Sequence, residues 1–187
     1  SCLKKNIKIN IHENPLFLTK KSELTPFFSP TKKKLFQTSF YKNQRIKFNI
    51  LLNNENKPEG GKWTYDDLNR KKYPKNKKTP IIDYSFLKST NYNDSIKYVS
   101  KYFSKNYGEI NDSQLYPSDF ETSKEWFNNF LKTRFNEFGI YEDAILINES
   151  AINHSILSPL VNSGLLDPKY IIEKSIKFYE KNNIPLN

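Results

Sequence analysis

The feature that most constrains the fold is an apolar stripe, rich in aromatic residues, in residues 122–138. Apolar side chains recur there every three or four positions, at Trp126, Phe127, Phe130, Leu131, Phe135 and Phe138. This spacing places them on one face of an α-helix, and such a face has to be covered by other elements. Thr122 and Glu125 have the spacing of a capping box, and Gly139 is typical of a helix end. We therefore expect a buried helix over 122–138.

Other segments carry weaker signals of the same kind. N-cap residues and apolar periodicity predict further helices over 39–52, 94–107 and 168–182, the last opened by Asp167-Pro168. The strict alternation from Ile7 to Ile11 predicts a short strand. Residues 53–82 contain three prolines and Gly60-Gly61, which is typical of a long loop. The chain is therefore expected to be mainly α.

Composition excludes several classes of protein. The chain has one cysteine, Cys2, which allows neither an internal disulfide nor a metal site made only of cysteines. No window approaches eighteen apolar residues and the N-terminus lacks a signal-peptide layout, so we expect no membrane span and a cytoplasmic location. Met is absent altogether. Either the initiator was removed before Ser1 or the chain is a piece of a longer protein.

Charge is unevenly distributed along the chain. Residues 1–78 hold 19 Lys/Arg against 6 Asp/Glu, whereas residues 79–187 hold 11 against 14. A basic half can follow a phosphate backbone, although an AT-rich genome would produce the same abundance of Lys, Asn and Ile. Arginine occurs only at Arg45, Arg70 and Arg134. Each could serve where a planar donor fork is needed, or three could be the background count.

The segment from His154 to Gly164 concentrates polar chemistry. Ser158 is predicted to cap a short helix that starts at Pro159 and stops at Gly164, with His154 and Ser155 just upstream. A helix N-terminus with nearby hydroxyls favours an anion such as phosphate or pyrophosphate, and an ordinary capped helix is the alternative. The two histidines and one cysteine support no metal constellation. The adjacent acids Glu142 and Asp143 do not indicate a paired-carboxylate mechanism.

The pattern His154-Ser155-x-Leu157-Ser158-Pro159-x-x-x-x-Gly164 resembles the flavin-phosphate motif of photolyases and cryptochromes, whose common form is Thr-Ser-x-Leu-Ser-Pro. Three further blocks, at 40–71, 135–144 and 163–187, resemble the bacterial iron–sulfur, (6-4)-type branch, the deoxyribodipyrimidine photolyase-related proteins. The most specific part runs from Gly60-Gly61-Lys62-Trp63 to Asn69-Arg70-Lys71. The resemblance covers nearly the whole chain.

This resemblance implies a fragment from the middle of a longer protein. Residues 1–52 would be the remnant of an α/β antenna domain, with one strand and one helix. Residues 53–93 would be the interdomain linker, and residues 94–187 the first helices of the all-helical FAD-binding domain. The parent would be a monomer that carries FAD, a 4Fe-4S cluster and a lumazine-type antenna pigment, with the cluster and pigment ligands outside this fragment. It would use blue or near-ultraviolet light to repair pyrimidine dimers, expected to be (6-4) photoproducts, in UV-damaged DNA.

The resemblance also implies the flavin contacts, which are Tyr141, His154, Ser155, Ile156, Leu157 and Ser158. Ser155 and Ser158 match the motif directly, His154 replaces the usual Thr, and Tyr141 rests on an approximate alignment. No catalytic or metal-binding residue is assigned, and the isolated chain is expected to be catalytically inactive. Two alternatives are a cryptochrome-like blue-light photoreceptor and a non-enzymatic basic module that binds DNA without flavin.

Overall fold

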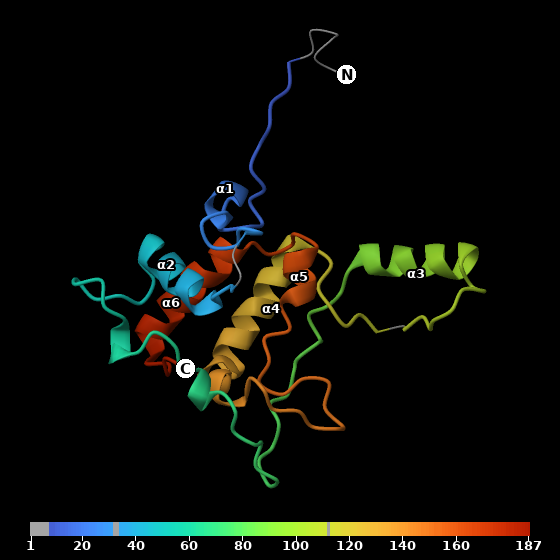
Figure 1. Ribbon diagram of the computed structural model, residues 1–187. Helices are drawn as coiled ribbons and strands as arrows, with labels where there is room; N and C mark the ends of the chain where they lie inside the picture. The colour runs from blue at the N-terminus through green and yellow to red at the C-terminus, as the bar shows by residue number, and fades with distance from the viewer. Residues whose placement is uncertain (1–7, 32–33, 112) are drawn as a thin grey trace.

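The computed structural model describes residues 8–31, 34–111 and 113–187, and it is mainly helical (Figure 1). Helix α4 (Phe120–Thr133) occupies the middle, with α5 (Ser158–Asn162) beside one end of it and α6 (Pro168–Asn182) packed against it. Helices α1 (Lys21–Leu24) and α2 (Gln37–Lys47) lie on the side of α6, whereas α3 (Thr90–Tyr102) projects away from the body. Four 3-10 turns complete the described elements: η2 (Glu59–Gly61), η3 (Asp66–Leu68), η4 (Phe135–Glu137) and η5 (Gly139–Tyr141).

The predicted aromatic stripe is confirmed as the core of the molecule. Trp126, Phe127, Phe130 and Leu131 are each at most 4% exposed. They form one cluster with three buried leucines in and next to α5, namely Leu157, Leu160 and Leu166. Burying a side chain of this size contributes about 1.5–3 kcal/mol, so α4 is held mainly by tertiary packing.

The bounds of α4 differ from the prediction at both ends. Asp119 is the N-cap, because its Oδ1 accepts a hydrogen bond from the Thr122 amide at 2.8 Å, so the predicted capping box at Thr122 is wrong. The α-helix ends at Thr133, where Arg134 adopts φ −129°. Phe135 and Phe138 therefore reach the core from the 3-10 turns that follow.

The other helices are confirmed in kind and shifted in extent. Helix α2 ends at Lys47, five residues before the predicted end, because Asn49 and Leu51 have positive φ and turn the chain. Helix α3 begins at Thr90 after the N-cap Ser89, earlier than predicted, and ends at Tyr102. Only α6 agrees closely, since the Asp167 carboxylate accepts from the Tyr170 amide at 2.8 Å.

The predicted strand is not confirmed. Residues 8–11 belong to no strand, Ile11 is 92% exposed, and Ile7 lies outside the described residues. Within the described ranges the only β-pairing is an isolated bridge between Leu52 and Pro58. Alternation alone cannot supply the partner strand that a sheet needs. Residues 53–82 form the expected long connection with two 3-10 turns, and the domain boundaries after 52 and 93 stay predictions.

The described residues contain neither a helix that could span a membrane nor a cluster of metal-ligating side chains. Among the helices described, none has both the length and the apolarity to cross a membrane. In the same ranges no group of three or more His, Cys, Asp or Glu side chains is placed to hold a metal ion. Cys2 lies outside the described residues.

Candidate functional site

The segment 154–158 is anchored to α4 by two side chains. Trp126 Nε1 donates a hydrogen bond to the Ser155 carbonyl at 3.3 Å, and Arg134 Nε donates to the His154 carbonyl at 3.2 Å. Both donors are at most 2% exposed. The central helix of the core therefore fixes the backbone of the segment that carries most of the predicted site.

The backbone of this segment makes a tight turn at Ile156. Ile156 adopts φ +56°, a rare conformation for a β-branched residue. Leu157 follows in the right-handed helical region, at φ −91° and ψ −14°. A left-handed residue followed by a right-handed one directs successive N–H groups into one concavity. The amides of Ile156, Leu157 and Ser158 donate to no described residue.

Two hydroxyl groups lie beside these amides. Ser155 is half-buried and Ser158 is exposed, and neither side chain hydrogen-bonds to another described residue. Ser158 is not the N-cap that the sequence predicts. Leu157 holds that position, and its carbonyl accepts from Leu160 and Val161 at 3.0 Å each. The Ser158 hydroxyl is therefore not used in capping and remains a free donor.

Ile156 and Leu157 contribute backbone rather than side chains to this surface. Leu157 is 8% exposed and belongs to the α4 core cluster, and Ile156 packs against that cluster. Such packing keeps Ile156 in a conformation that costs about 1–3 kcal/mol elsewhere. The core therefore imposes the geometry of the turn.

His154 and Tyr141 belong to the side of the site that faces η5. His154 Nε2 lies 3.0 Å from the Glu142 carbonyl, which brings the two predicted segments together. The Tyr141 ring, however, is 6% exposed and packs on Tyr73 with ring centres 4.7 Å apart. Lys77 Nζ lies 5.4 Å from the centre of the Tyr141 ring. Burial in this environment raises the pKa of the Tyr73 hydroxyl. The structure thus groups His154, Ser155 and Ser158 and gives Tyr141 a separate apolar environment.

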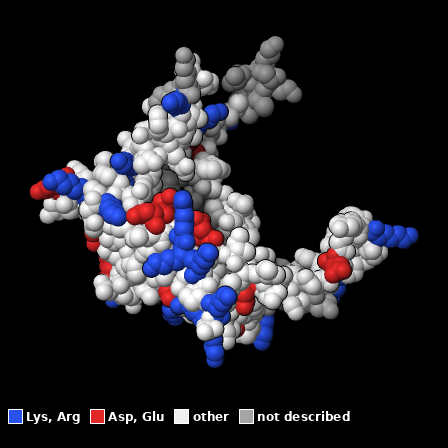
Figure 2. Space-filling view, turned by 60° about the horizontal axis from the view of Figure 1, so that its bottom comes forward, with Lys and Arg blue, Asp and Glu red and all other residues white. Residues whose placement is uncertain are grey.

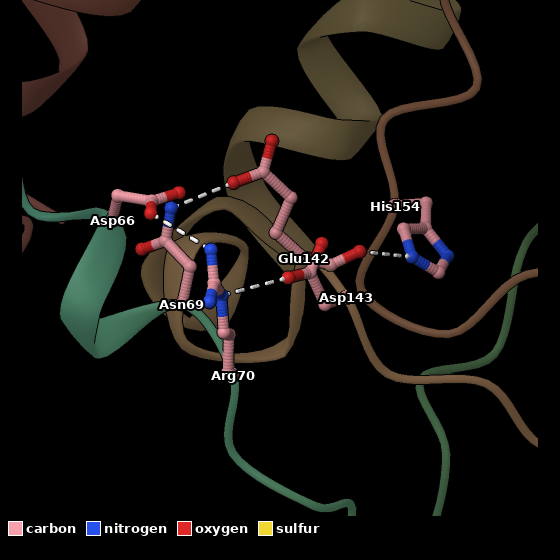
Figure 3. Close-up of polar contacts among 6 residues, drawn as sticks. All are labelled: Asp66, Asn69, Arg70, Glu142, Asp143 and His154. Atoms are coloured by element: carbon pink, nitrogen blue, oxygen red, sulfur yellow. Dashed lines mark hydrogen bonds and ion pairs between the residues drawn. The ribbon is translucent and has the colours of Figure 1, made fainter.

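Glu142 and Asp143 connect the linker to this region (Figure 3). Asn69 Nδ2 donates to Glu142 Oε2 at 2.8 Å. Arg70 pairs with Asp66 at 2.8 Å and with Asp143 at 3.5 Å. The two adjacent acids therefore bind different linker side chains, and the linker is held on the turn that also contacts His154.

Arg134 positions the segment 154–158 through the His154 carbonyl, and no sequence motif points to it. It is 1% exposed, and within the described ranges it pairs with no carboxylate. Its Nη1 lies 3.3 Å from Asn129 Oδ1 and its guanidinium lies 5.6 Å from the Phe130 ring centre. Burial lowers its pKa, because desolvation penalises the charged form. A buried cation without a counter-ion favours an anion nearby. The sequence signal that could have pointed to Arg134 is the rarity of arginine in this chain.

The described segment fits the phosphate end of a dinucleotide better than its ring end. Three free amides and two hydroxyls match the acceptor-rich surface of a diphosphate. The cavity that His154 lines measures about 160 Å³. Pockets for a ligand with a fused ring system are usually about 300–1,000 Å³. The flavin ring is therefore not accommodated in that cavity.

Comparison with known proteins places the chain among photolyase relatives. The family model described as "Deoxyribodipyrimidine photo-lyase-related protein" matches residues 1–115. A protein named (6-4) photolyase from Agrobacterium fabrum is 27% identical over 184 residues, covering 97% of this chain and 35% of the relative. One uncharacterized protein of Acanthamoeba polyphaga mimivirus is 45% identical over 47 residues, covering 25% of this chain and 36% of the relative. A second one from the same virus is 42% identical over 72 residues, covering 37% of this chain and 36% of the relative. The chain spans about a third of the length of these curated relatives. It belongs to the deoxyribodipyrimidine photo-lyase-related protein family.

Proposed function

We propose that this chain forms the diphosphate-binding edge of the FAD site in a light-driven DNA photolyase that repairs (6-4) photoproducts. The observation that carries the proposal is the turn at 156–158, where three consecutive backbone amides and two nearby hydroxyls have no partner among the described residues. Family membership and the name of the Agrobacterium fabrum relative support the photolyase part.

In this proposal the residues of the chain bind and orient the cofactor. The amides of 156–158 and the hydroxyls of Ser155 and Ser158 donate to the diphosphate oxygens, and His154 flanks them. The buried charge of Arg134 adds electrostatic attraction for the anion. Bound FAD would supply the light-driven electron transfer, while the protein supplies position and electrostatics.

The diphosphate site can be tested on the 187-residue chain itself. Titration with FAD and with pyrophosphate, followed by ¹⁵N NMR, should shift the amides of Ile156, Leu157 and Ser158. Replacing Ser155 and Ser158 together by Ala should weaken binding by at least about tenfold, because even one lost hydrogen bond to a charged group is worth about 1.5–3 kcal/mol. Ser163→Ala is the matched control, since that hydroxyl bonds only to its own helix. Shifts that avoid 156–158 would contradict the assignment.

DNA is the proposed partner, and the exposed lysines of the 71–78 loop support it. Lys71, Lys72, Lys75 and Lys78 are exposed, and none forms an ion pair with a described carboxylate. Figure 2 shows several Lys and Arg side chains on the face that looks downward in Figure 1, next to a group of Asp and Glu side chains. Each phosphate contact would contribute a salt-dependent term to DNA affinity.

Repair can be tested in a chimera. The chain would replace the matching third of the Agrobacterium fabrum photolyase, and light-dependent loss of (6-4) photoproducts would be measured. Repair by a chimera that retains flavin supports the proposal. Flavin retention without repair favours the cryptochrome-like photoreceptor, and salt-dependent DNA binding by a folded chimera without flavin favours the basic module.

A further inference from the structure

One ring nitrogen of His154 is committed to the backbone of the neighbouring turn. His154 Nε2 lies 3.0 Å from the Glu142 carbonyl oxygen (Figure 3). A carbonyl oxygen can only accept, so Nε2 carries the proton of this hydrogen bond. In the neutral ring the other nitrogen, Nδ1, then has a lone pair and no proton. Neutral His154 therefore has no free donor to offer to an anion.

The linker holds the turn that supplies this carbonyl. The Lys71 amide donates to the Ile140 carbonyl at 3.2 Å. On the other side of the turn, the Asp143 amide donates to the Asn69 carbonyl at 3.5 Å. The Asn69 side chain also donates to the Glu142 carboxylate at 2.8 Å. Backbone and side-chain contacts therefore fix the acceptor of the imidazole, so the neutral ring keeps the same nitrogen protonated.

The charged groups near His154 are one guanidinium and three carboxylates. Arg134, at the end of α4, donates from Nε to the His154 carbonyl at 3.2 Å. Glu142 and Asp143 are each bound to a linker side chain, at 2.8 Å and 3.5 Å. Glu149 lines the same small cavity as His154, and its Oε1 accepts from a linker hydroxyl at 3.0 Å. Each carboxylate thus has another partner, and Nδ1 bonds to no described residue.

We infer that the candidate diphosphate site takes up a proton from solvent when it binds its ligand, and that His154 is the residue that receives it. The inference rests on the proposed function, because it concerns the same site. Protonation at Nδ1 gives the ring a free N–H donor and a full positive charge. The neutral ring supplies neither, so a diphosphate binds the protonated form more tightly.

The position of His154 in the chain makes this charge effective. His154 lies two residues before Ile156, so their Cα atoms are at most about 7 Å apart. This separation is within the Debye length of about 8 Å at physiological salt, so salt screens the attraction only partly. Histidine is also the side chain whose charge ordinarily changes between about pH 5 and 8. Affinity for a diphosphate should therefore rise as pH falls through this range.

FAD is the suitable probe, because its diphosphate is esterified at both ends and keeps the same charge across this range. Pyrophosphate gains protons itself and would obscure the effect. Titration of the 187-residue chain with FAD at about pH 5.5 and about pH 8 would be followed by ¹⁵N NMR at the amides of residues 156–158. Binding should be about threefold to tenfold tighter at the lower pH, as expected for one added charge near the ligand. Equal affinity at the two pH values would overturn the inference.

The second histidine of the chain provides a matched control. His154→Gln keeps a side-chain N–H for the Glu142 carbonyl but cannot take up a proton, so it should bind FAD equally at both pH values. His12→Gln removes the other histidine, which is exposed, and should retain the pH dependence. A pH dependence that survives His154→Gln would belong to another group and would overturn the inference.

A measurement on the unaltered chain avoids any effect of substitution on folding. Linkage is reciprocal, so bound FAD should favour the protonated ring to the same extent as protonation favours FAD. The ¹H NMR signals of the His154 ring should therefore titrate about 0.5–1 pH higher with FAD than without it, which corresponds to the threefold to tenfold change in affinity. The His12 ring should titrate at the same pH in both samples. An unmoved His154 titration would overturn the inference.

The outcomes separate this inference from the proposed function. FAD-induced shifts at residues 156–158 with equal affinity at both pH values would retain the diphosphate site and overturn the proton uptake. FAD titrations that leave those amides unshifted at both pH values would contradict the diphosphate site and the inference with it.

Discussion

At the scale of single residues, the three arginines are the most informative side chains. Arg45 is 6% exposed and donates to the carbonyls of Ile50, Leu51 and Trp63. Arg70 joins two acids, and Arg134 holds the His154 carbonyl. A planar fork with several fixed donors suits these tasks, and a lysine would satisfy only some of them. The sequence-based suggestion that retained arginines serve where a fork is needed is consistent with all three positions.

Arg134→Met should lower the free energy of unfolding by about 1–3 kcal/mol, because the His154 carbonyl loses its buried donor. Denaturant unfolding measures the change. Lys132→Met is the control on the same helix, and an exposed substitution of this kind should stay within about 0.5 kcal/mol. An Arg134→Met variant as stable as the parent would contradict this prediction. It would mean that the recovered desolvation penalty of the buried charge equals the free energy of the lost hydrogen bond.

At the scale of elements, α4 shows how a single cap sets a helix boundary. Asp119 lies three residues before the predicted N-cap, and its carboxylate accepts directly from the Thr122 amide. That hydrogen bond lowers the pKa of Asp119. A carboxylate whose pKa is depressed on folding adds stability above its unfolded pKa, and this stability is lost as pH falls through the folded pKa.

Asp119→Ala should therefore destabilise the chain by about 1 kcal/mol at neutral pH. The difference from the parent should shrink below about pH 4, where the unfolded-state carboxyl takes up its proton. Thermal unfolding across this pH range measures both effects. Asp119→Asn retains the acceptor without the charge and should recover most of the stability while removing the pH dependence. A pH dependence that persists in the Asn variant would assign it to another carboxyl.

At the scale of the whole molecule, contacts distant in sequence join the linker to the helices. Tyr179 on α6 donates to Glu59 Oε1 at 2.7 Å, across 120 residues. This hydrogen bond, with some burial, raises the pKa of Tyr179 to about 12. Asn69 and Arg70 make the second connection, to Glu142 and Asp143. The linker is therefore packed on the helical part at both ends of η3.

The Tyr179–Glu59 contact predicts a late-titrating tyrosine. Its pKa is raised on folding, so its contribution to stability is complete below pH 10 and is lost as pH rises toward about 12. Ultraviolet titration should show one tyrosinate forming after the others, and Tyr179→Phe should remove that component. Glu59→Gln should return the ionisation toward the ordinary range. A late component that survives Tyr179→Phe would belong to Tyr73 or another tyrosine.

The sequence by itself determined the features that depend on neighbours within about one helical turn. The apolar period of α4 and the Asp167-Pro168 start of α6 are local signals, and the structure confirms them. The motif at 154–158 likewise identified the segment that carries the candidate site. Its predicted flavin contacts remain predictions, with Ser155 and Ser158 in the arrangement that supports them best.

The tertiary structure decided whatever depends on distant partners. Trp126 and Arg134 lie at least 20 residues from the carbonyls that they hold, so no local pattern links them to the site. Packing against the core cluster holds Ile156 in its left-handed conformation, and Leu157 rather than Ser158 is the N-cap of α5. The strand predicted from alternation at 7–11 lacks support for a related reason. A strand is completed by pairing, and pairing is a property of the folded chain rather than of five residues in sequence.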